Sequence, residues 1–293
     1  MTGGEIGSAV QLACLLEASA SKPGNVTPGR RFRDMSYEDF LASAAAIGPA
    51  FTRAGERSLG ATILEAIQAT RRWTRGNTNL GIILLAAPLA RAAAVGGPLH
   101  EGVRRELEAS TVEDAVLAYE AIRLASPGGL GSAAEADVRD RPTVTLRHAM
   151  QLSAHRDSIA QEWASGFDIT FGCGVPALRA ALAAGLSWAD ATVETYLRLL
   201  AQVGDTLIAR KLGPAAAREV SEEASAVLAR GGVRTPEGRA RLDAFDRALR
   251  DPDNHRNPGT TADLTAAALL VVILEREAPL GCGEDSPTRP IGR

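Results

Sequence analysis

Gly76-Asn77-Thr78-Asn79-Leu80-Gly81 is a polar break between two helical segments, and the rest of the chain is organised around it. Before it, residues 59–75 carry apolar side chains at helical spacing, and after it residues 82–95 are almost wholly apolar. We therefore expect two core helices that meet here. Asn77 and Thr78 are good N-cap residues, and the free amides of the following helix suit a phosphate or another anion. A helix cap needs no ligand, so the break alone leaves both interpretations open.

The composition favours a helical protein with a real core. The chain has 293 residues, of which 45% are hydrophobic and only 4% aromatic. Few aromatic residues and abundant alanine favour closely packed helices over sheets. No segment alternates polar and apolar residues over the length of a strand. We predict an all-α fold with a single domain over residues 1–278, followed by a flexible tail at 279–293 that is rich in Pro and Gly.

Charge and cysteine usage narrow the class of partners. A net charge of −3 gives no general attraction to nucleic acid or to an anionic membrane, so any anion site must be local. The three cysteines are far apart and lack metal-ligand spacing, which argues against a disulfide framework or a zinc site. No apolar run is long enough to span a bilayer, and the N-terminus lacks a signal-peptide pattern. We expect a soluble, cytoplasmic protein without a nucleic-acid partner.

Residues 21–29 form an irregular loop, because two prolines and two glycines prevent a regular helix. Lys22 lies in this loop, and Arg33 and Asp34 follow it. Cations and one carboxylate thus gather on a segment without helical constraint. The pattern is compatible with phosphate binding and equally with a solvated basic loop.

Three capping-box patterns predict helix starts directly. They lie at Ser36-Tyr37-Glu38-Asp39, Thr111-Val112-Glu113-Asp114 and Ser187-Trp188-Ala189-Asp190. We expect the first of these helices to stop near residues 48–49, the second to run to 125 and the third to 203. None of these boxes needs a functional explanation.

Two further turns place aspartates at helix starts. Gly204-Asp205-Thr206 precedes Arg210, and Asp263 opens an apolar helix over residues 264–274. Ion pairing explains the first arrangement, and the helix dipole favours the second, without any ligand. Taken together, however, four polar helix-start loops with nearby cations suit a polyphosphate. We therefore expect the central break, Asp34, Asp205 and Asp263 to converge on one cleft.

These motifs together resemble the triphosphoribosyl-dephospho-CoA synthases. These are all-helical enzymes that build the prosthetic-group precursor of citrate lyase and malonate decarboxylase. The resemblance covers most of the chain, with the motifs in the same order. It lies in Ser21-Lys22-Pro23-Gly24-Asn25-Val26, Asp34-Met35 with residues 40–49, Asn77-Thr78-Asn79-Leu80-Gly81, Gly204-Asp205-Thr206 and Ala262-Asp263-Leu264.

The sequence departs from the family pattern at three of these motifs. The family's K-P-G-L-V-D is K-P-G-N-V-T at residues 22–27, which loses a carboxylate. Its N-T-H-K-G is N-T-N-L-G at residues 77–81, which loses a histidine and a lysine. Its G-G-S-A-D is P-G-T-T-A-D at residues 258–263. The missing lysine would weaken phosphate contact at the central break.

The resemblance implies a glycosyl transfer from ATP. A ribose hydroxyl of dephospho-CoA attacks the anomeric carbon of the ATP ribose, and adenine leaves. The reaction needs a base, assistance for the departing adenine, and cations for the triphosphate. Asp34, Asp205 and Asp263 are the implied catalytic residues in an order left open, with Asp205 and Asp263 as ligands of Mg²⁺. The implied substrate-binding residues are Lys22, Arg33 and Arg210 for phosphate, and Asn77, Thr78 and Asn79 for ribose or phosphate.

Two alternatives remain open from the sequence. The altered central break is compatible with a nucleotide-dependent transferase of another cofactor pathway, such as one that makes a pterin-type carrier. A helical protein that binds a nucleotide without catalysis would keep the same motifs. Adenine release from ATP in the presence of dephospho-CoA separates these hypotheses.

Overall fold

The computed structural model describes residues 1–127 and 135–276. Within this part of the chain there are fourteen α-helices, one π-helical turn and one 3-10 turn. The described residues form no sheet, and the one isolated β-bridge joins Thr27 to Arg30. The predicted all-α fold is confirmed. The tail expected at residues 279–293 lies outside the described residues.

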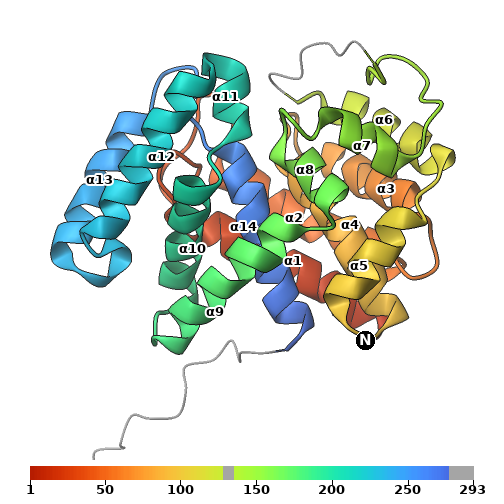
Figure 1. Cartoon of the computed structure of the whole chain (residues 1–293), viewed down its shortest axis with the longest axis horizontal. Helices are drawn as coiled ribbons and strands as arrows, with labels where there is room; N and C mark the ends of the chain where they lie inside the picture. Colours follow the sequence, from red (N-terminus) through yellow and green to blue (C-terminus); the bar gives the residue numbers. More distant parts are fainter. Residues whose placement is uncertain (128–134, 277–293) are drawn as a thin grey trace, which may run out of the picture.

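Most connections between the helices are short, but a long loop joins α1 to α2. Their bounds are α1 (Gly3–Ser19), α2 (Tyr37–Thr52), α3 (Leu59–Arg71), α4 (Leu80–Val95), α5 (Leu99–Glu108), α6 (Val112–Ala125), α7 (Leu146–Ser153), α8 (Ser158–Ser165), η1 (Thr170–Gly174), α9 (Val175–Ala183), α10 (Trp188–Gln202), α11 (Thr206–Leu212), α12 (Pro214–Ala229), η2 (Gly232–Arg234), α13 (Pro236–Leu249) and α14 (Gly259–Leu274). Figure 1 shows α14 in the middle of the molecule, with α10 to α13 on one side and α3 to α7 on the other.

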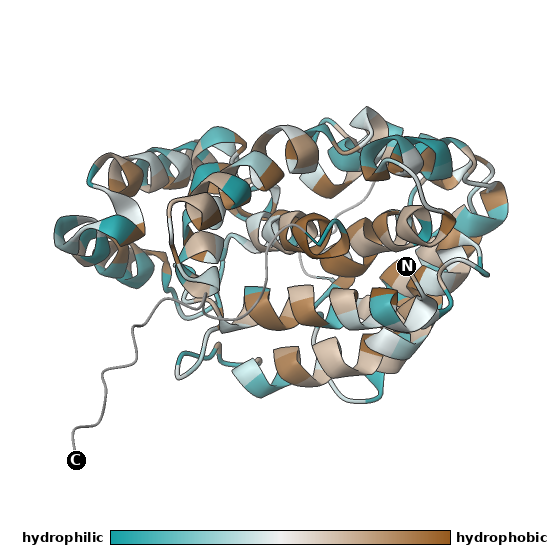
Figure 2. Cartoon of the chain, turned by 90° about the horizontal axis from the view of Figure 1, so that it is seen from below, coloured by the Kyte–Doolittle hydropathy of each residue, from teal (hydrophilic) through white to brown (hydrophobic). Residues whose placement is uncertain are grey.

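Two clusters of buried apolar side chains hold these helices together. The larger cluster joins α1 to α9 with α14 and includes the fully buried Trp163 and Phe167. The smaller cluster joins α10 to α13 and includes Tyr196 and Phe245. Both α10 and α14 contribute to the two clusters, so they connect the two sides of the molecule. In Figure 2 the apolar residues are concentrated in the central helices and the hydrophilic ones on the outer helices.

The central helix α4 is buried along most of its length because nearly all its side chains are apolar.

Within the described ranges, no single helix is both long and apolar enough to cross a membrane. The pair α4 and α5 satisfies that test only together, with a bend of 113° between them.

The predicted end of α2 near residues 48–49 is wrong. The helix continues to Thr52 with Pro49 inside it. Proline has no N–H, so the carbonyl of Ala45 lacks its usual helical donor. The side chain of Gln11 in α1 replaces that donor, because its Nε2 donates to Ala45 O at 2.7 Å. A Cβ at Gly48 would overlap the same Gln11 side chain, so glycine lets the two helices approach closely.

The other predicted helix starts agree with the structure in part. Full capping boxes open α2 at Ser36 and α6 at Thr111. At Ser187 the side chain caps α10, but Asp190 instead pairs with Arg239 at 2.9 Å. The last helix, α14, begins five residues before the expected position.

Candidate active site

A cavity of about 570 Å³ lies where the N-terminal ends of α4, α8 and α14 meet α11. This volume is within the range of pockets that bind small molecules and cofactors. The predicted site residues that line it are Asp34, Asn77, Thr78, Asn79, Arg210 and Asp263. Lys22, Arg33 and Asp205 are not among the lining residues. The structure thus brings together six of the nine residues singled out from the sequence.

Asp263 lies in the first turns of α14 and faces the start of α4. A Cβ on Gly81 would overlap its Oδ2 and would lie 3.0 Å from its Oδ1. The glycine of the central break therefore makes room for this carboxylate. Among the described residues, the Asp263 carboxylate forms no hydrogen bond or ion pair. An unpaired carboxylate that faces a cavity is available to a ligand.

Burial raises the pKa of Asp263 well above its ordinary value. The carboxylates of Glu17, Asp205 and Asp157 raise this pKa further, whereas Arg210 lowers it. Removal from water and like charge both disfavour the ionised form. Burial and like charge therefore destabilise the Asp263 carboxylate, and a cation or a cationic transition state would stabilise it.

Glu17, at the C-terminal end of α1, lines the cavity and is held by Lys22. The ammonium nitrogen of Lys22 lies 3.0 Å from Oε1 of Glu17 and donates to Ala20 O at 3.2 Å and to Glu17 O. Both side chains are buried. Because a lysine ammonium has three N–H donors, these contacts occupy all of them. Lys22 thus positions Glu17, and its ammonium has no donor left for a phosphate.

Asp205 is buried and connects two helix starts. Its Oδ1 accepts from Ile208 N at 3.0 Å, at the start of α11. Its Oδ2 accepts from the amide and the hydroxyl of Thr261 in α14, both at 2.8 Å. Burial raises the pKa of Asp205, and these hydrogen bonds act against that rise. The side chain therefore caps both helices, which is also why α14 begins as early as Gly259.

Cations line the side of the cavity formed by α11 and the turn before α8. Arg156, Arg210 and Lys211 are all lining residues. Arg210 pairs with Asp157, the N-cap of α8, and Lys211 Nζ donates to Asn254 O at 3.2 Å. Burial lowers the pKa of Lys211, whereas the charges of Asp205, Asp251 and Asp34 raise it. This side is the most suitable part of the cavity for phosphate groups.

The three polar residues of the central break have structural partners as well. Asn77 Oδ1 accepts from Leu80 N at 3.0 Å, which satisfies a free amide at the start of α4. Thr78 Oγ1 lies 2.5 Å from the Ser43 hydroxyl, and Asn79 Nδ2 donates to Thr70 Oγ1 at 3.1 Å. These contacts fix the shape of the loop that borders the cavity.

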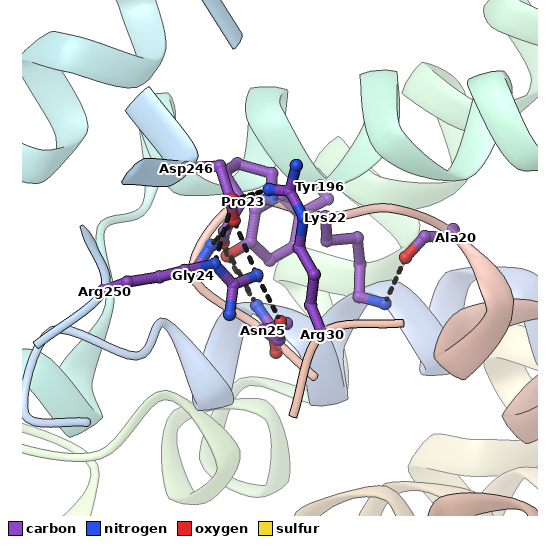
Figure 3. Close-up of polar contacts among 9 residues, drawn as sticks. All are labelled: Ala20, Lys22, Pro23, Gly24, Asn25, Arg30, Tyr196, Asp246 and Arg250. Carbon is purple, nitrogen blue, oxygen red and sulfur yellow. Dashed lines mark hydrogen bonds and ion pairs between the residues drawn. The ribbon is translucent and has the colours of Figure 1, made fainter. Parts of the chain in front are cut away.

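The loop between α1 and α2 is fastened to the other side of the molecule, as Figure 3 shows. Asp246 in α13 accepts from Gly24 N at 2.9 Å and pairs with Arg30 and Arg250. In the same loop, Asn25 Nδ2 donates to the Tyr196 hydroxyl at 2.8 Å. The lining residues that follow in this loop are thereby held in place.

A family model described as ATP:dephospho-CoA triphosphoribosyl transferase matches residues 4–281. The chain belongs to this family. A Vibrio cholerae relative, whose name is that of a 2-(5''-triphosphoribosyl)-3'-dephosphocoenzyme-A synthase, is 30% identical over 285 residues that cover 91% of this chain and 87% of the relative. A Pseudomonas putida relative of the same name is 38% identical over 108 residues, which cover 36% of this chain and 37% of the relative.

A crystal structure of an Archaeoglobus fulgidus protein, named as a triphosphoribosyl-dephospho-coA synthase, has the same fold. Its TM-score is 0.62 at 29% sequence identity, and the match covers 80% of this chain and 98% of that one. The fold and the family expected from the sequence motifs are therefore confirmed.

In this member of the triphosphoribosyl transferase family, several charged lining residues were not predicted from the sequence, Lys211 among them. Glu17, Arg156 and Asp157 face the same cavity as Asp263. Glu17 lies five positions before Lys22, so their pairing could have been considered from the sequence. Asp157 gave no stronger signal than an ordinary N-cap, because its contact with Arg210 joins positions far apart in the chain.

Proposed function

We propose that this chain transfers the triphosphoribosyl group of ATP to 3'-dephospho-CoA and releases adenine. Family membership supports this proposal. The observation that carries it into the structure is the unpaired Asp263 carboxylate, which shares a cavity with Arg210 and Lys211. A bond forms between a ribose oxygen of dephospho-CoA and the anomeric carbon of ATP. The bond from that carbon to adenine breaks, and the triphosphate stays on the transferred sugar.

Asp263 is the best-placed residue to accept the proton of the attacking hydroxyl. It lines the cavity between the central break and α11, and no described residue pairs with its carboxylate. A general base must lie within hydrogen-bond reach of the proton and have a pKa near the working pH. Burial raises the pKa of Asp263 and the nearby Arg210 lowers it, so a bound cation would favour the carboxylate form that accepts a proton. Adenine leaves with a proton, which balances the proton that Asp263 takes from the hydroxyl, and Asp34 lines the same cavity.

Phosphate binding is assigned to the cationic side of the cavity. Arg156, Arg210 and Lys211 would stabilise the negative charge of the triphosphate. Asn77 and Asn79 border the same space and would orient the ribose. Arg33 is exposed and Lys22 is fully engaged with Glu17, so neither is needed for this assignment.

The side chains present do not form a magnesium site of their own. Among the described residues, no group of three or more His, Cys, Asp or Glu side chains has the arrangement to hold a metal ion. Both oxygens of Asp205 accept hydrogen bonds from α11 or α14, which leaves Asp263 as the one open member of the predicted ligand pair. Mg²⁺ is commonly bound largely through substrate phosphates. We therefore propose that it enters with ATP, bound to the triphosphate.

Adenine release tests this function directly. The protein is incubated with Mg-ATP, with and without dephospho-CoA, and free adenine is measured by chromatography. We expect release that depends on dephospho-CoA, and a rate at least about 100-fold lower for Asp263→Asn, in line with loss of a general base. Tight ATP binding without adenine release would contradict the proposal and favour a non-catalytic nucleotide-binding protein.

A further inference from the structure

Three large apolar side chains that lie close together in sequence line the cavity. They are Phe32 and Met35 in the loop before α2, and Phe40 in the first turn of α2. None of them is a member of either hydrophobic cluster. Phe32 is 9% exposed, and Met35 and Phe40 are partly exposed. We call these three residues the apolar shelf.

An apolar side chain gains stability when it is removed from water, at about 25 cal/mol per Å². The large apolar side chains of Trp163 and Phe167, in contrast, are completely buried in the core. The shelf instead leaves apolar surface facing a cavity that Arg210 and Lys211 also line, and the charge of Asp34, beside the shelf, acts on Lys211. A ligand that covers the shelf must therefore have an apolar face and also tolerate cations a short distance away.

The shelf is held rigidly before any ligand binds. Phe32 N donates to Met35 O at 2.8 Å, which closes a tight turn between them. A Cβ on Gly76 would lie 2.9 Å from Cε of Met35, so Met35 packs against the central break. The capping box at Ser36 fixes the start of α2 just before Phe40. A preformed surface of this kind loses little entropy on binding a flat ring.

Asp34 adds a specific polar group beside the shelf. It lies between Phe32 and Met35 in sequence and lines the same cavity. A carboxylate accepts hydrogen bonds but does not donate them when ionised. An aromatic ring with an exocyclic amino group matches both the shelf and this acceptor, and phosphates attached through a sugar match the cations that line the same cavity.

We propose that the shelf of Phe32, Met35 and Phe40 binds the adenine ring of a substrate nucleotide, with Asp34 accepting a hydrogen bond from its amino group. The inference rests on the proposed function only in that both substrates, ATP and dephospho-CoA, carry adenine. Base stacking on an aromatic side chain contributes about 1–3 kcal/mol per base. Loss of one shelf residue should therefore weaken binding of the adenine compound by about tenfold, which is about 1.4 kcal/mol.

Equilibrium binding to the full-length protein tests the proposal without requiring turnover. Phe40→Ala and Met35→Ala are compared with the parent chain. The matched control is Phe171→Ala, because Phe171 is also partly exposed but stacks on His100 at 4.0 Å between ring centres and does not line the cavity. The ligands are ATP, dephospho-CoA, tripolyphosphate and 4'-phosphopantetheine. Tripolyphosphate lacks the base, and 4'-phosphopantetheine is the arm of dephospho-CoA without its nucleoside.

We expect both shelf variants to lose about tenfold in affinity for ATP, for dephospho-CoA or for both, and to bind tripolyphosphate as the parent does. The ligand that is affected identifies which adenine occupies the shelf, and unchanged tripolyphosphate binding shows that the variants are folded. Equal losses for ATP and tripolyphosphate would overturn the proposal. So would an unchanged affinity for both adenine compounds, a loss confined to 4'-phosphopantetheine, or the same loss in Phe171→Ala.

This result is separable from the fate of the proposed function. A shelf that binds adenine in a protein that releases none would leave the inference standing and refute the transfer reaction. If the Phe40→Ala variant releases adenine with the parental KM for both substrates, the transfer reaction stands and the inference about the shelf is refuted.

Discussion

Gly81→Ala is the substitution that most sharply tests the position of Asp263. The new methyl group would overlap Oδ2 of Asp263, whereas ordinary van der Waals contacts begin near 3.4 Å. The carboxylate, or the start of α4, must therefore move by about 1 Å or more. A displacement of that size at a reacting centre can lower the rate by about 100-fold. The crowding should also destabilise the protein by about 1–3 kcal/mol.

The matched control for this substitution is Gly4→Ala. Gly4 is the second residue of α1, as Gly81 is of α4, and a Cβ there meets nothing within 4 Å. Alanine at an unobstructed helix position stabilises by up to about 1 kcal/mol. Gly4→Ala should therefore keep full activity and an equal or higher melting temperature.

The assay combines steady-state adenine release with thermal unfolding of both variants. We expect kcat/KM to fall about 100-fold in Gly81→Ala and to stay at the parental value in Gly4→Ala. If Gly81→Ala retains parental activity, the placement of Asp263 against the start of α4 is not what the reaction requires. Equal losses in both variants would show that helix starts in general, and not this contact, are sensitive to alanine.

Three further predictions concern charge. Asp263→Asn should abolish most activity yet leave the melting temperature unchanged or higher, because burial and like charges disfavour the Asp263 carboxylate. A large decrease in the melting temperature would instead indicate a structural role. Lys22→Met should destabilise by about 3–5 kcal/mol by leaving Glu17 buried and unpaired, and adding Glu17→Gln should recover part of that loss in urea unfolding. Burial raises the pKa of Glu162 to about 7, because the buried side chain favours its protonated form. The stabilisation that this proton gives the folded state is complete below pH 4.5 and is lost as the pH rises through 7. Glu162 should therefore lower the free energy of unfolding by about 3 kcal/mol between pH 4.5 and 8. The Glu162→Gln variant should lack this pH-dependent decrease, and the same pH dependence in parent and variant would contradict the prediction.

Local patterns were sufficient to predict several of the helices. The capping boxes at Ser36 and Thr111 place the starts of α2 and α6 correctly, because both partners of a box lie within four residues. The end of α2 was misplaced because the donor that compensates for Pro49 is Gln11, on another helix. Information of that kind is held in the packing of α1 against α2 and not in either segment alone.

The candidate site was predictable in part for the same reason. Asp34, Asp263 and the residues of the central break line one cavity, as their shared polar character suggested. Asp205 and Asp263 look alike in sequence, since both lie near a helix start beside threonines. Only the approach of α11 to α14 distinguishes them. It directs the Asp205 oxygens to Ile208 and Thr261, and it leaves Asp263 facing Gly81.

The mass of the product formed from ATP and dephospho-CoA tests directly whether the triphosphoribosyl group is transferred between them. We expect a single adduct that contains dephospho-CoA plus the triphosphoribosyl group, formed in equal amount to the adenine released and absent with Asp263→Asn. Adenine release without consumption of dephospho-CoA would show hydrolysis of ATP at the glycosidic bond. That result, or an undiminished yield of adduct with Asp263→Asn, would contradict the account.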